Sequence, residues 1–386
     1  MAKMVLIAPC HFGLEAVLKR EITELGYEIE SVDDGRVSFY GDGEAVAMAN
    51  LALRTAERIL IRVGIFKATS FDQLFERTKA LPWNEILPRD ARFWVTKVSS
   101  VKSQLFSPSD IQSVMKKAMV EQMKIWYGIS RFPETGASYP LRVSIKKDIV
   151  TVGLDTTGTS LHKRGYRVAP VIAPISETLA AAILGLTPWH PDRILVDPFC
   201  GSGTIPIEAA MQARHIAPGL RRHFLAEEWK TMVDEAAWFD ARQELKSQII
   251  SHVETDIQGY DIDPRAVRFA RQNAEAAGVG DIIHFQARAV RDLHHPKSYG
   301  FIVTNPPYGE RIEDKAALPE LYGQIGDAFR GLPTWSMYLI TSYEDAEKYI
   351  GRRADKNRKL YNGMLKTYVY QYLGPKPPKR TREERV

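Results

Sequence analysis

The sequence predicts an α/β protein in which a doubly wound parallel sheet follows a smaller α+β module. From about residue 171, short apolar strands alternate with helices, which is the pattern of such a sheet. Residues 1–68 instead alternate strand, helix, strand, strand, helix, strand. The length of 386 residues and the 45% hydrophobic content allow two to three folded domains.

The first 68 residues predict a ferredoxin-like domain. Apolar residues at helical spacing, and alternating β-branched residues, predict its elements. The helices are Gly13–Leu25 and Ala45–Leu53, and the strands are Met4–Pro9, Tyr27–Glu30, Arg36–Tyr40 and Arg58–Phe66.

Residues 69–165 predict a second α+β domain that is strongly basic. Residues 61–170 hold 18 Lys and Arg against 9 Asp and Glu, whereas residues 1–60 hold 6 against 10. A helix begins at Ser107-Pro108, with Ser at the N-cap and Pro at the first helical position. Lys116 and Lys117 fall outside its apolar stripe, where a phosphate could reach them. A basic block beside a near-neutral one favours a domain that grips a polyanion, although a solvated basic face is the alternative.

The predicted parallel-sheet domain covers residues 171–373. About forty residues near 215–255 interrupt its repeat as inserted helices, with Trp229 and Trp238 packed inward. Asn362-Gly363 predicts a closing antiparallel hairpin, and residues 374–386 read as a basic disordered tail. The predicted strands are Arg193–Asp197, Ile257–Asp261, Ile282–Gln286, Phe301–Thr304, Trp335–Thr341, Lys359–Tyr361 and Leu365–Leu373.

Several classes of protein are disfavoured by composition. No apolar run approaches the roughly 18 residues of a membrane helix. The two cysteines, Cys10 and Cys200, have no metal-ligand spacing, and the histidines show none either, so we expect no metal. So few cysteines fit a reducing cytoplasm. The sequence does not indicate an oligomeric state.

The segment Asp197-Pro-Phe-Cys-Gly-Ser-Gly-Thr204 predicts a cofactor-binding turn between a strand and a helix. Gly201 and Gly203 would bring backbone N–H groups and a helix N-terminus next to a ligand. Asp197 at the strand end would repel a pyrophosphate but attract a cationic amino group. The turn therefore favours S-adenosylmethionine over NAD. Cys200 lies inside the turn, so packing or cofactor contact is favoured over a nucleophilic role.

Three further aspartates follow predicted strands. Asp261 could accept both ribose hydroxyls of a nucleoside. Asp263 precedes Pro264 and reads better as a helix cap. Asp292 could accept from an adenine amino group, and an ordinary loop aspartate is an equal alternative.

The segment Asn305-Pro-Pro-Tyr308 follows an apolar strand and would lie at its carboxyl edge. The Asn305 side-chain oxygen and the Pro306 carbonyl can accept N–H bonds from an exocyclic amine, orienting its lone pair toward an incoming methyl group. Pro306 and Pro307 hold the loop rigid. Tyr308 could stack on a flipped base.

Cationic side chains gather where the basic block meets the parallel-sheet domain, at Leu161-His-Lys-Arg-Gly-Tyr-Arg167. They could hold a phosphate, or they could form a salt-bridge network in a linker.

These segments resemble the THUMP-domain class I RNA methyltransferases, and above all the family containing the amino-terminal half of the bifunctional large-subunit rRNA guanine-N2 methyltransferase. The resemblance covers roughly residues 1–373. It implies a ferredoxin-like domain plus a THUMP module for RNA capture, and a Rossmann-like domain that uses S-adenosylmethionine. The matching segments are His162–Arg167, Ala173–Leu179, Asp197–Ala210, Gly259–Pro264 and Asn305–Arg311.

The resemblance and the residue patterns together give three sets of expected site residues. The catalytic set is Asn305, Pro306, Pro307 and Tyr308. The cofactor set is Ser176, Glu177, Thr178, Asp197, Cys200, Gly201, Gly203, Thr204, Asp261, Ile262 and Asp292. The RNA-binding set is Lys97, Lys102, Lys116, Lys117, Lys163, Arg164 and Arg167.

The sequence thus predicts a cytoplasmic RNA guanine-N2 methyltransferase whose favoured substrate is 23S rRNA. A tRNA guanine-N2 enzyme is the first alternative, because THUMP modules also serve tRNA. Adenine-N6 methylation of DNA is the second, because Asn-Pro-Pro-Tyr alone does not separate the two amines. Methylation of a protein glutamine is a third, disfavoured by the basic module. A non-catalytic RNA-binding role ranks last, because the cofactor residues are present.

Overall fold

The computed structural model describes residues 3–168, 175–309, 312–362 and 365–378. The chain divides into two compact units, each described by itself. The first comprises residues 1–10, 18–161 and 222–244, and the second comprises residues 11–17, 162–221 and 245–386.

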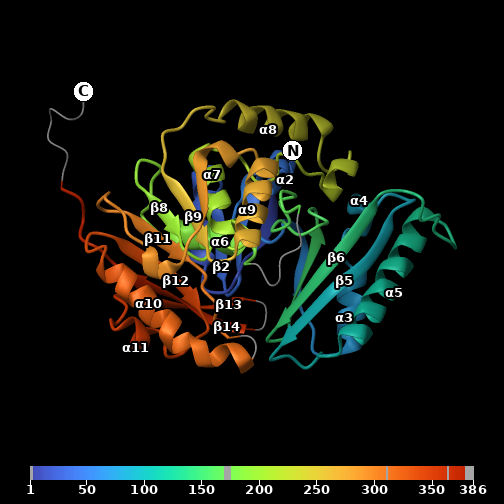
Figure 1. Ribbon diagram of the computed structural model, residues 1–386. Coiled ribbons are helices and arrows are strands. Elements are labelled where there is room, and N and C mark those ends of the chain that lie inside the picture. Colours follow the sequence, from blue (N-terminus) through green and yellow to red (C-terminus); the bar gives the residue numbers. More distant parts are fainter. Residues whose placement is uncertain (1–2, 169–174, 310–311, 363–364, 379–386) are drawn as a thin grey trace. The chain divides into compact units, whose positions relative to one another are not determined.

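The first unit contains a seven-stranded sheet of order β2-β3-β1-β4-β7-β6-β5 (Figure 1). The arrangement β2-β3-β1-β4, with two crossing helices, is the predicted ferredoxin-like fold. Strand β4 pairs with β1 on one side and with β7 on the other, so the ferredoxin-like and THUMP regions share one sheet. The strands are β1 (Met4–Pro9), β2 (Ile29–Asp33), β3 (Arg36–Gly41), β4 (Leu60–Lys67), β5 (Arg92–Val101), β6 (Ser138–Lys146) and β7 (Ile149–Asp155).

Helices of the first unit pack on this sheet through small and apolar residues. Helix α5 begins at Pro108 as predicted, although the Ser107 hydroxyl lies 3.2 Å from that of Ser109 and does not cap the backbone. Met115 and Met119 of α5 are buried in the core. The helices are α1 (Glu15–Glu24, whose first turn belongs to the second unit), α2 (Gly43–Ala52), α3 (Phe71–Lys79), α4 (Trp83–Ile86) and α5 (Pro108–Tyr127).

The predicted insertion contains the short 3₁₀ helix η1 (Leu225–Glu228) and helix α8 (Glu235–Ser247). Residues 222–244 belong to the first unit although they interrupt the second in sequence. Trp229 is fully buried and stacks on Tyr139 of β6, with ring centroids 4.8 Å apart, and its Nε1 donates to the Ser138 carbonyl at 3.0 Å. Trp238 stacks on Phe224 at 5.5 Å. Both tryptophans are buried, as predicted.

The second unit contains a seven-stranded sheet of order β10-β9-β8-β11-β12-β14-β13. Strands β8 to β12 run parallel, and β14 and β13 close the sheet antiparallel, which confirms the predicted doubly wound sheet. The strands are β8 (Leu195–Asp197), β9 (Ile257–Asp261), β10 (Ile283–Ala287), β11 (Phe301–Thr304), β12 (Ser336–Thr341), β13 (Lys356–Asn362) and β14 (Leu365–Tyr372).

Helices cover both faces of this sheet (Figure 1). One face packs against α6 (Glu177–Leu186), α7 (Thr204–Ala213) and α9 (Pro264–Ala277), and the other against α10 (Leu318–Arg330) and α11 (Ala346–Ile350). Short 3₁₀ helices η2 (Gly280–Ile282), η3 (Val290–Asp292) and η4 (Ile312–Ala317) join the elements. Gly278 ends α9 in the left-handed region. The predicted Asn362-Gly363 turn and most of the predicted tail lie outside the described residues.

Candidate active site

The candidate site lies where the parallel sheet changes direction. The chain builds β8, β9 and β10 in one direction and then returns to add β11 on the other side of β8. In such sheets, ligands bind outside the carboxyl ends of the strands at this switch point. Asp197 ends β8, Asp261 ends β9, and Asn305 directly follows β11, so three of the predicted residues meet at one edge.

Asp197 is a buried carboxylate, only 2% exposed. Its Oδ1 accepts from the Thr304 hydroxyl at 2.7 Å and from the Phe199 N–H at 3.1 Å. Burial raises the pKa of Asp197 to about 7, the charge of Asp261 adds to the rise, and the two hydrogen bonds oppose it. The carboxylate would be stabilised by a cationic partner, which is what the sequence predicted for this position.

The glycine-rich turn after β8 is fixed by backbone geometry and by Asp261. Gly201 and Gly203 have φ of 51° and 83°, in the left-handed region that favours glycine. A Cβ at Gly203 would lie 3.0 Å from the Ala270 Cβ, so this turn packs directly on α9. A Cβ at Gly201 would meet open space. The Gly201 N–H donates to Asp261 Oδ2 at 3.0 Å, and burial raises the pKa of Asp261.

Cys200, in the same turn, is buried. Burial, with the charges of Asp197 and Asp261, holds the pKa of its thiol well above the usual range. A thiol kept protonated is a poor nucleophile, which fits packing or cofactor contact.

The start of α6 carries three residues of the predicted cofactor set, and Arg167 links it to the first residue of α7. Ser176 is the N-cap, and its Oγ lies 3.3 Å from His11 Nε2. Arg167 Nη2 lies 3.2 Å from Glu177 Oε1 and donates to the Thr204 hydroxyl at 3.1 Å. Burial raises the pKa of Glu177, and Arg167 opposes that rise. Thr178 is fully buried behind these residues.

The remaining predicted cofactor residues sit at the rim of the strand ends. Asp263 accepts from the Arg265 N–H at 2.9 Å and caps α9, as predicted. Ile262, between Asp261 and Asp263, is 75% exposed and would be free to cover a ligand. Asp292 is exposed at the end of η3 after β10.

The loop Asn305-Pro-Pro-Tyr308 is supported by Tyr322, a residue that no local sequence pattern distinguishes. The Tyr322 hydroxyl donates to the Pro307 carbonyl at 3.2 Å and lies 2.5 Å from the Thr341 hydroxyl. Burial raises the pKa of Tyr322 above its usual range, so the hydroxyl keeps its proton. The loop is therefore held at the end of β11 by a fixed hydrogen-bond chain.

Tyr308 faces a cavity of about 640 Å³. Ligand pockets commonly fall within roughly 300–1,000 Å³, so a nucleobase would fit. Tyr343, which lines this cavity, packs on Tyr322 with ring centroids 4.9 Å apart. The other lining residues are Gly309, Lys315, Leu318, Ser342, Glu344 and Asp345.

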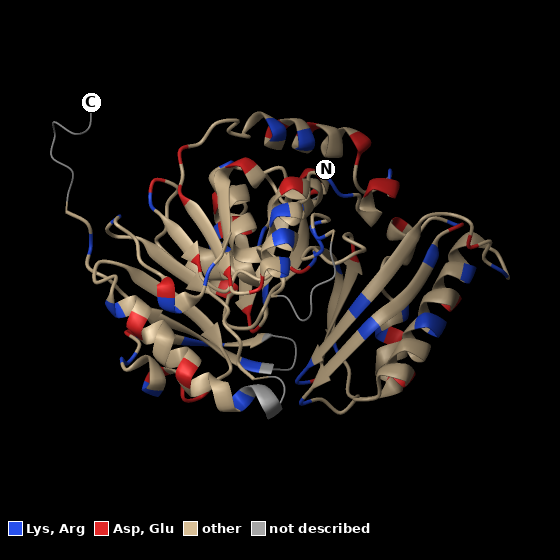
Figure 2. Ribbon diagram, in the orientation of Figure 1, with Lys and Arg blue, Asp and Glu red and all other residues tan. Residues whose placement is uncertain are grey.

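Four predicted RNA-binding residues are exposed: Lys97, Lys102, Lys117 and Lys163. Figure 2 shows Lys and Arg distributed along β5, β6 and α5, the elements of the predicted THUMP module. Lys116 is different, because its Nζ donates to the Phe93 carbonyl and lies 3.8 Å from the Phe93 ring centroid. Desolvation lowers the pKa of Lys116. Its ammonium also lies 3.7 Å from Glu134 Oε1, and the side chain stays partly exposed, so an RNA contact for Lys116 remains a prediction.

The predicted contact of Arg164 with RNA is wrong. Its side chain is 1% exposed, and its Nε lies 3.5 Å from Glu208 Oε1, which also accepts from the Tyr166 hydroxyl at 3.1 Å. Arg167 is half-buried and committed to Glu177 and Thr204. Residues Leu161–Arg167 were predicted to hold a phosphate or to form a salt-bridge network. The salt-bridge network describes both Arg164 and Arg167.

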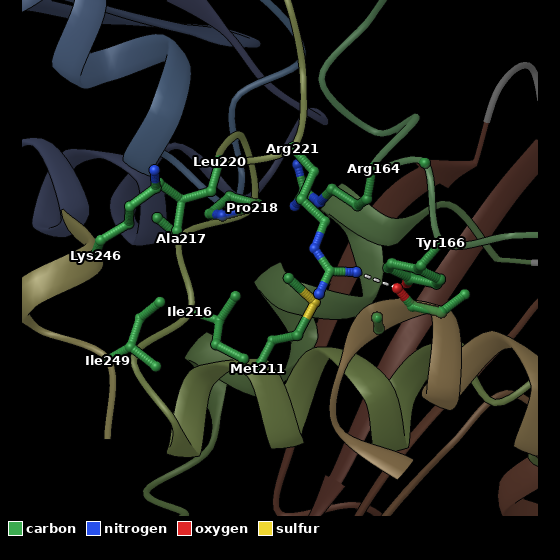
Figure 3. Close-up of a pocket in the computed structure, with 13 residues that line it drawn as sticks. Arg164, Tyr166, Met211, Ile216, Ala217, Pro218, Leu220, Arg221, Lys246 and Ile249 are labelled. Carbon is green, nitrogen blue, oxygen red and sulfur yellow. Dashed lines mark hydrogen bonds between the residues drawn. The ribbon is translucent and has the colours of Figure 1, made fainter. Parts of the chain in front are cut away.

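Arg164 and Tyr166 border a second cavity, of about 410 Å³, near the last turns of α7 and α9. Figure 3 shows Arg164, Tyr166 and Arg221 around it, with the Arg221 guanidinium donating to the Ala276 carbonyl. Helix α7 begins at the glycine turn, so this cavity lies at the end of the helix remote from Asp197.

The sequence alone did not identify several residues that contact Asp197 and the Asn305–Tyr308 loop or line the cavity beside Tyr308. Thr304 was assigned only to a strand, and Tyr322, Tyr343 and Glu344 had no assigned role. Their contacts join segments far apart in the sequence, so no local signal identifies them. Among the described residues, no group of three metal-ligating side chains occurs, and no helix is long and apolar enough to cross a membrane.

Comparisons with known proteins agree with this geometry. The RMKL-like methyltransferase domain matches residues 164–371, the RlmL ferredoxin-like domain matches residues 5–60, and the THUMP domain matches residues 68–155. The "Putative RNA methyltransferase YpsC" of Bacillus subtilis (strain 168) is 47% identical over 100% of both chains.

Two solved structures are similar over nearly their whole length. A "predicted N6-adenine-specific DNA methylase" from Listeria monocytogenes str. 4b F2365 is 50% identical, with a TM-score of 0.91 and 97% of each chain covered. SMU.472, complexed with SAH, is 42% identical, with a TM-score of 0.91, covering 98% of this chain and 100% of that one.

The fold and the site together define a Rossmann-like methyltransferase preceded by ferredoxin-like and THUMP regions. The chain belongs to the RMKL-like methyltransferase family. The predicted fold class and the predicted family are both confirmed.

Proposed function

We propose that this methyltransferase modifies the exocyclic N2 of a guanosine in RNA, and that its substrate is 23S rRNA. The observation that carries the proposal is the Asn305–Tyr308 loop at the end of β11, at the same sheet edge as the buried carboxylate of Asp197 and the half-buried carboxylate of Asp261. Without specifying the target base or the particular RNA, the chain is an S-adenosylmethionine-dependent RNA methyltransferase, as its family and its THUMP domain indicate.

The residues present fit S-adenosylmethionine. Asp197 is a buried carboxylate whose pKa is raised by burial, so a cationic amino group beside it would remove an electrostatic penalty. Asp261 would accept from the ribose hydroxyls, and the open space at Gly201 would admit the ligand against the backbone. When bound, the cofactor supplies a methyl group on a sulfonium, which is an electrophile. Ser176, Glu177 and Thr178 would line its methionine end, and Asp292 would meet the adenine.

The chain's own residues would prepare the amine. Its nitrogen is a poor nucleophile because its lone pair is delocalised into the ring. The Asn305 Oδ1 and the Pro306 carbonyl would accept its two N–H groups, which turns the lone pair toward the methyl group and stabilises positive charge developing on nitrogen. Tyr322 and Thr341 hold this loop in place, and Tyr308 would stack on the base.

The cavity beside Tyr308 favours guanine over adenine. Guanine presents an N1–H donor next to its exocyclic amine, whereas adenine presents an N1 acceptor there. The lining residues Glu344 and Asp345 carry carboxylates, which accept hydrogen bonds and cannot donate them when ionised. A carboxylate would therefore bind the guanine edge and repel the adenine edge.

The exposed lysines Lys97, Lys102 and Lys117 of the THUMP region support RNA capture, with residues 61–170 as its main surface. The match to the RlmL ferredoxin-like domain favours 23S rRNA over tRNA. On this proposal the enzyme acts in rRNA processing in the cytoplasm. The domains would be residues 1–68, 69–165 and 171–373.

The test is transfer of tritium from labelled S-adenosylmethionine to total RNA from a strain that lacks the gene, followed by nucleoside analysis. Label in N2-methylguanosine from the large-subunit rRNA fraction supports the proposal. Label in the same nucleoside from tRNA would move the substrate to tRNA, and label in N6-methyladenosine would overturn the assignment of the base.

The Asn305→Ala variant supplies the internal control. It should bind S-adenosylhomocysteine as the wild type does but lose transfer by about 10²–10³-fold, because the amine loses an acceptor that acts on the developing charge. Near-normal turnover would show that Asn305 does not act on the amine.

A further inference from the structure

Four alternating cationic and aromatic residues form a patch on the closing hairpin of the second unit. Lys359 and Tyr361 lie on β13, and Lys366 and Tyr368 lie on β14. In the antiparallel register, Lys359 is opposite Tyr368, and Tyr361 is opposite Lys366. The Lys359 Nζ lies 5.2 Å from the Tyr361 ring centroid, and the Lys366 Nζ lies 5.1 Å from that of Tyr368.

The side chains of this patch lie on the sheet face that packs against α10 and α11, where Tyr368 borders the core and the two lysines reach solvent. Leu360 and Val369, which alternate with them along the two strands, are fully buried. Lys359 and Lys366 are exposed, and the two tyrosines are half-buried. Phe12, which is 43% exposed, extends the aromatic surface, with its ring 5.9 Å from that of Tyr361 in an edge arrangement. We call these five residues the hairpin patch.

The hairpin patch lies beside the candidate target cavity. Tyr368 pairs with Thr341, the last residue of β12, and the Thr341 hydroxyl lies 2.5 Å from that of Tyr322, which in turn donates to Pro307. Tyr361 and Lys366 lie two residues farther along the hairpin, beyond the end of β12. Lys366 is also within electrostatic reach of Glu344, which lines the cavity beside Tyr308. The patch therefore continues outward from the site where the base would bind.

This composition fits one kind of partner. Single-stranded nucleic acid is bound by aromatic rings on which bases stack, combined with cations that track the backbone. Stacking is tolerant of sequence because every base has a π face, so a patch of this kind positions a strand without reading it.

We propose that the hairpin patch holds the single-stranded RNA next to the target nucleotide, with a base against Tyr361 or Phe12 and the adjoining phosphates at Lys359 and Lys366. The inference rests on the proposed function, since it assumes an RNA strand leading from the cavity at Tyr308. It adds an RNA contact on the catalytic unit to the one expected of the THUMP region.

The experiment uses the full chain and a fluorescein-labelled oligouridylate of about 12 nucleotides, within the usual site sizes for single strands. The variants are K359Q with K366Q, and Tyr361→Leu. The matched control is Arg353→Gln with Lys356→Gln, which removes the same charge from exposed residues of the same region outside the patch. Binding of S-adenosylhomocysteine by calorimetry verifies that each variant keeps a folded second unit.

We expect the double lysine variant to bind the oligonucleotide about tenfold more weakly and to lower the slope of log affinity against log salt by about 1.4, at roughly 0.7 for each phosphate contact. Tyr361→Leu should lose about tenfold in affinity without a change in that slope, because it removes stacking and no charge. The control pair should stay close to the wild type.

The inference is overturned if the double lysine variant matches the control pair, or if the wild type does not bind the oligonucleotide. These outcomes differ from failure of the proposed function, which shows in the wild type alone as an absence of label in RNA. Wild-type transfer to RNA together with unaltered patch variants would remove the inference and leave the proposed function intact.

Discussion

Replacing Asp197 with Asn should make the second unit more stable at neutral pH while weakening cofactor binding. The Asp197 carboxyl is buried, and burial raises its pKa from 3.8 to about 7. Between these two values the folded state holds a proton that the unfolded chain releases. The stability that Asp197 contributes is therefore fully present below about pH 4 and is lost as the pH rises to about 7.

The size of the effect follows from the shift. A difference of roughly three pKa units corresponds to about 4 kcal/mol of unfolding free energy at pH 8, and to about 1.5 kcal/mol at pH 5, where the loss is only partly complete. An Asn side chain keeps an oxygen that can accept from Thr304 and Phe199 but carries no charge. The advantage of Asp197→Asn over the wild type should therefore grow by about 2.5 kcal/mol between pH 5 and pH 8.

The assay is chemical unfolding at pH 5 and pH 8. The unfolding transition of the second unit is identified as the one that S-adenosylhomocysteine stabilises, because that unit carries the cofactor site. The matched control is Asp292→Asn, which removes a carboxylate from an exposed residue. Affinity of Asp197→Asn for S-adenosylhomocysteine should fall at least about tenfold, through loss of a charge-assisted hydrogen bond. An Asn variant that is no more stable than the wild type at pH 8 would refute the argument that the buried charge carries an electrostatic cost.

Two further predictions concern the target loop and the base. Tyr322→Phe removes the hydroxyl that bridges Pro307 and Thr341. Turnover, measured by steady-state methyl transfer, should fall about tenfold, and thermal unfolding should show a loss of about 1 kcal/mol in stability. Unchanged turnover would show that the loop needs no support from Tyr322. Combining Glu344→Gln with Asp345→Asn should lower kcat/KM for guanosine substrates by about 10–100-fold, because an amide oxygen accepts from the N1–H more weakly than a carboxylate does. Equal kcat/KM in that variant and the wild type, measured on one RNA, would remove the carboxylates from base recognition.

Local signals in the sequence predicted which residues meet at the carboxyl edge of the parallel sheet. Glycines at Gly201 and Gly203, an aspartate at the end of each of two strands, and the rigid Asn305–Tyr308 loop each specify a backbone conformation within a few residues. The periodicity change near residue 171 likewise predicted the parallel sheet, since strand–helix alternation is a local property. These features could be predicted because each depends on residues that are neighbours in the sequence.

Other features depended on which distant segments meet. Strand β4 joins the ferredoxin-like and THUMP regions into one sheet. Trp229, from a segment that interrupts the second unit in sequence, stacks on Tyr139 within the first unit. Arg164 looked like a phosphate ligand among basic neighbours, but Glu208, more than forty residues later, neutralises it in the core. A buried charge is retained only with a partner, and that partner is not visible locally.

The sequence by itself determined the fold class and the family, and it predicted which residues stand at the strand ends, because these follow from periodicity, turn residues and short motifs. Only the tertiary structure decided which cations remain free for RNA, which hydroxyls hold the target loop, and which aromatic rings lie beside the cavity. Exposure and pairing are set by contacts between residues remote in the chain, so the same lysine or arginine can be a ligand or a structural ion according to what folds against it.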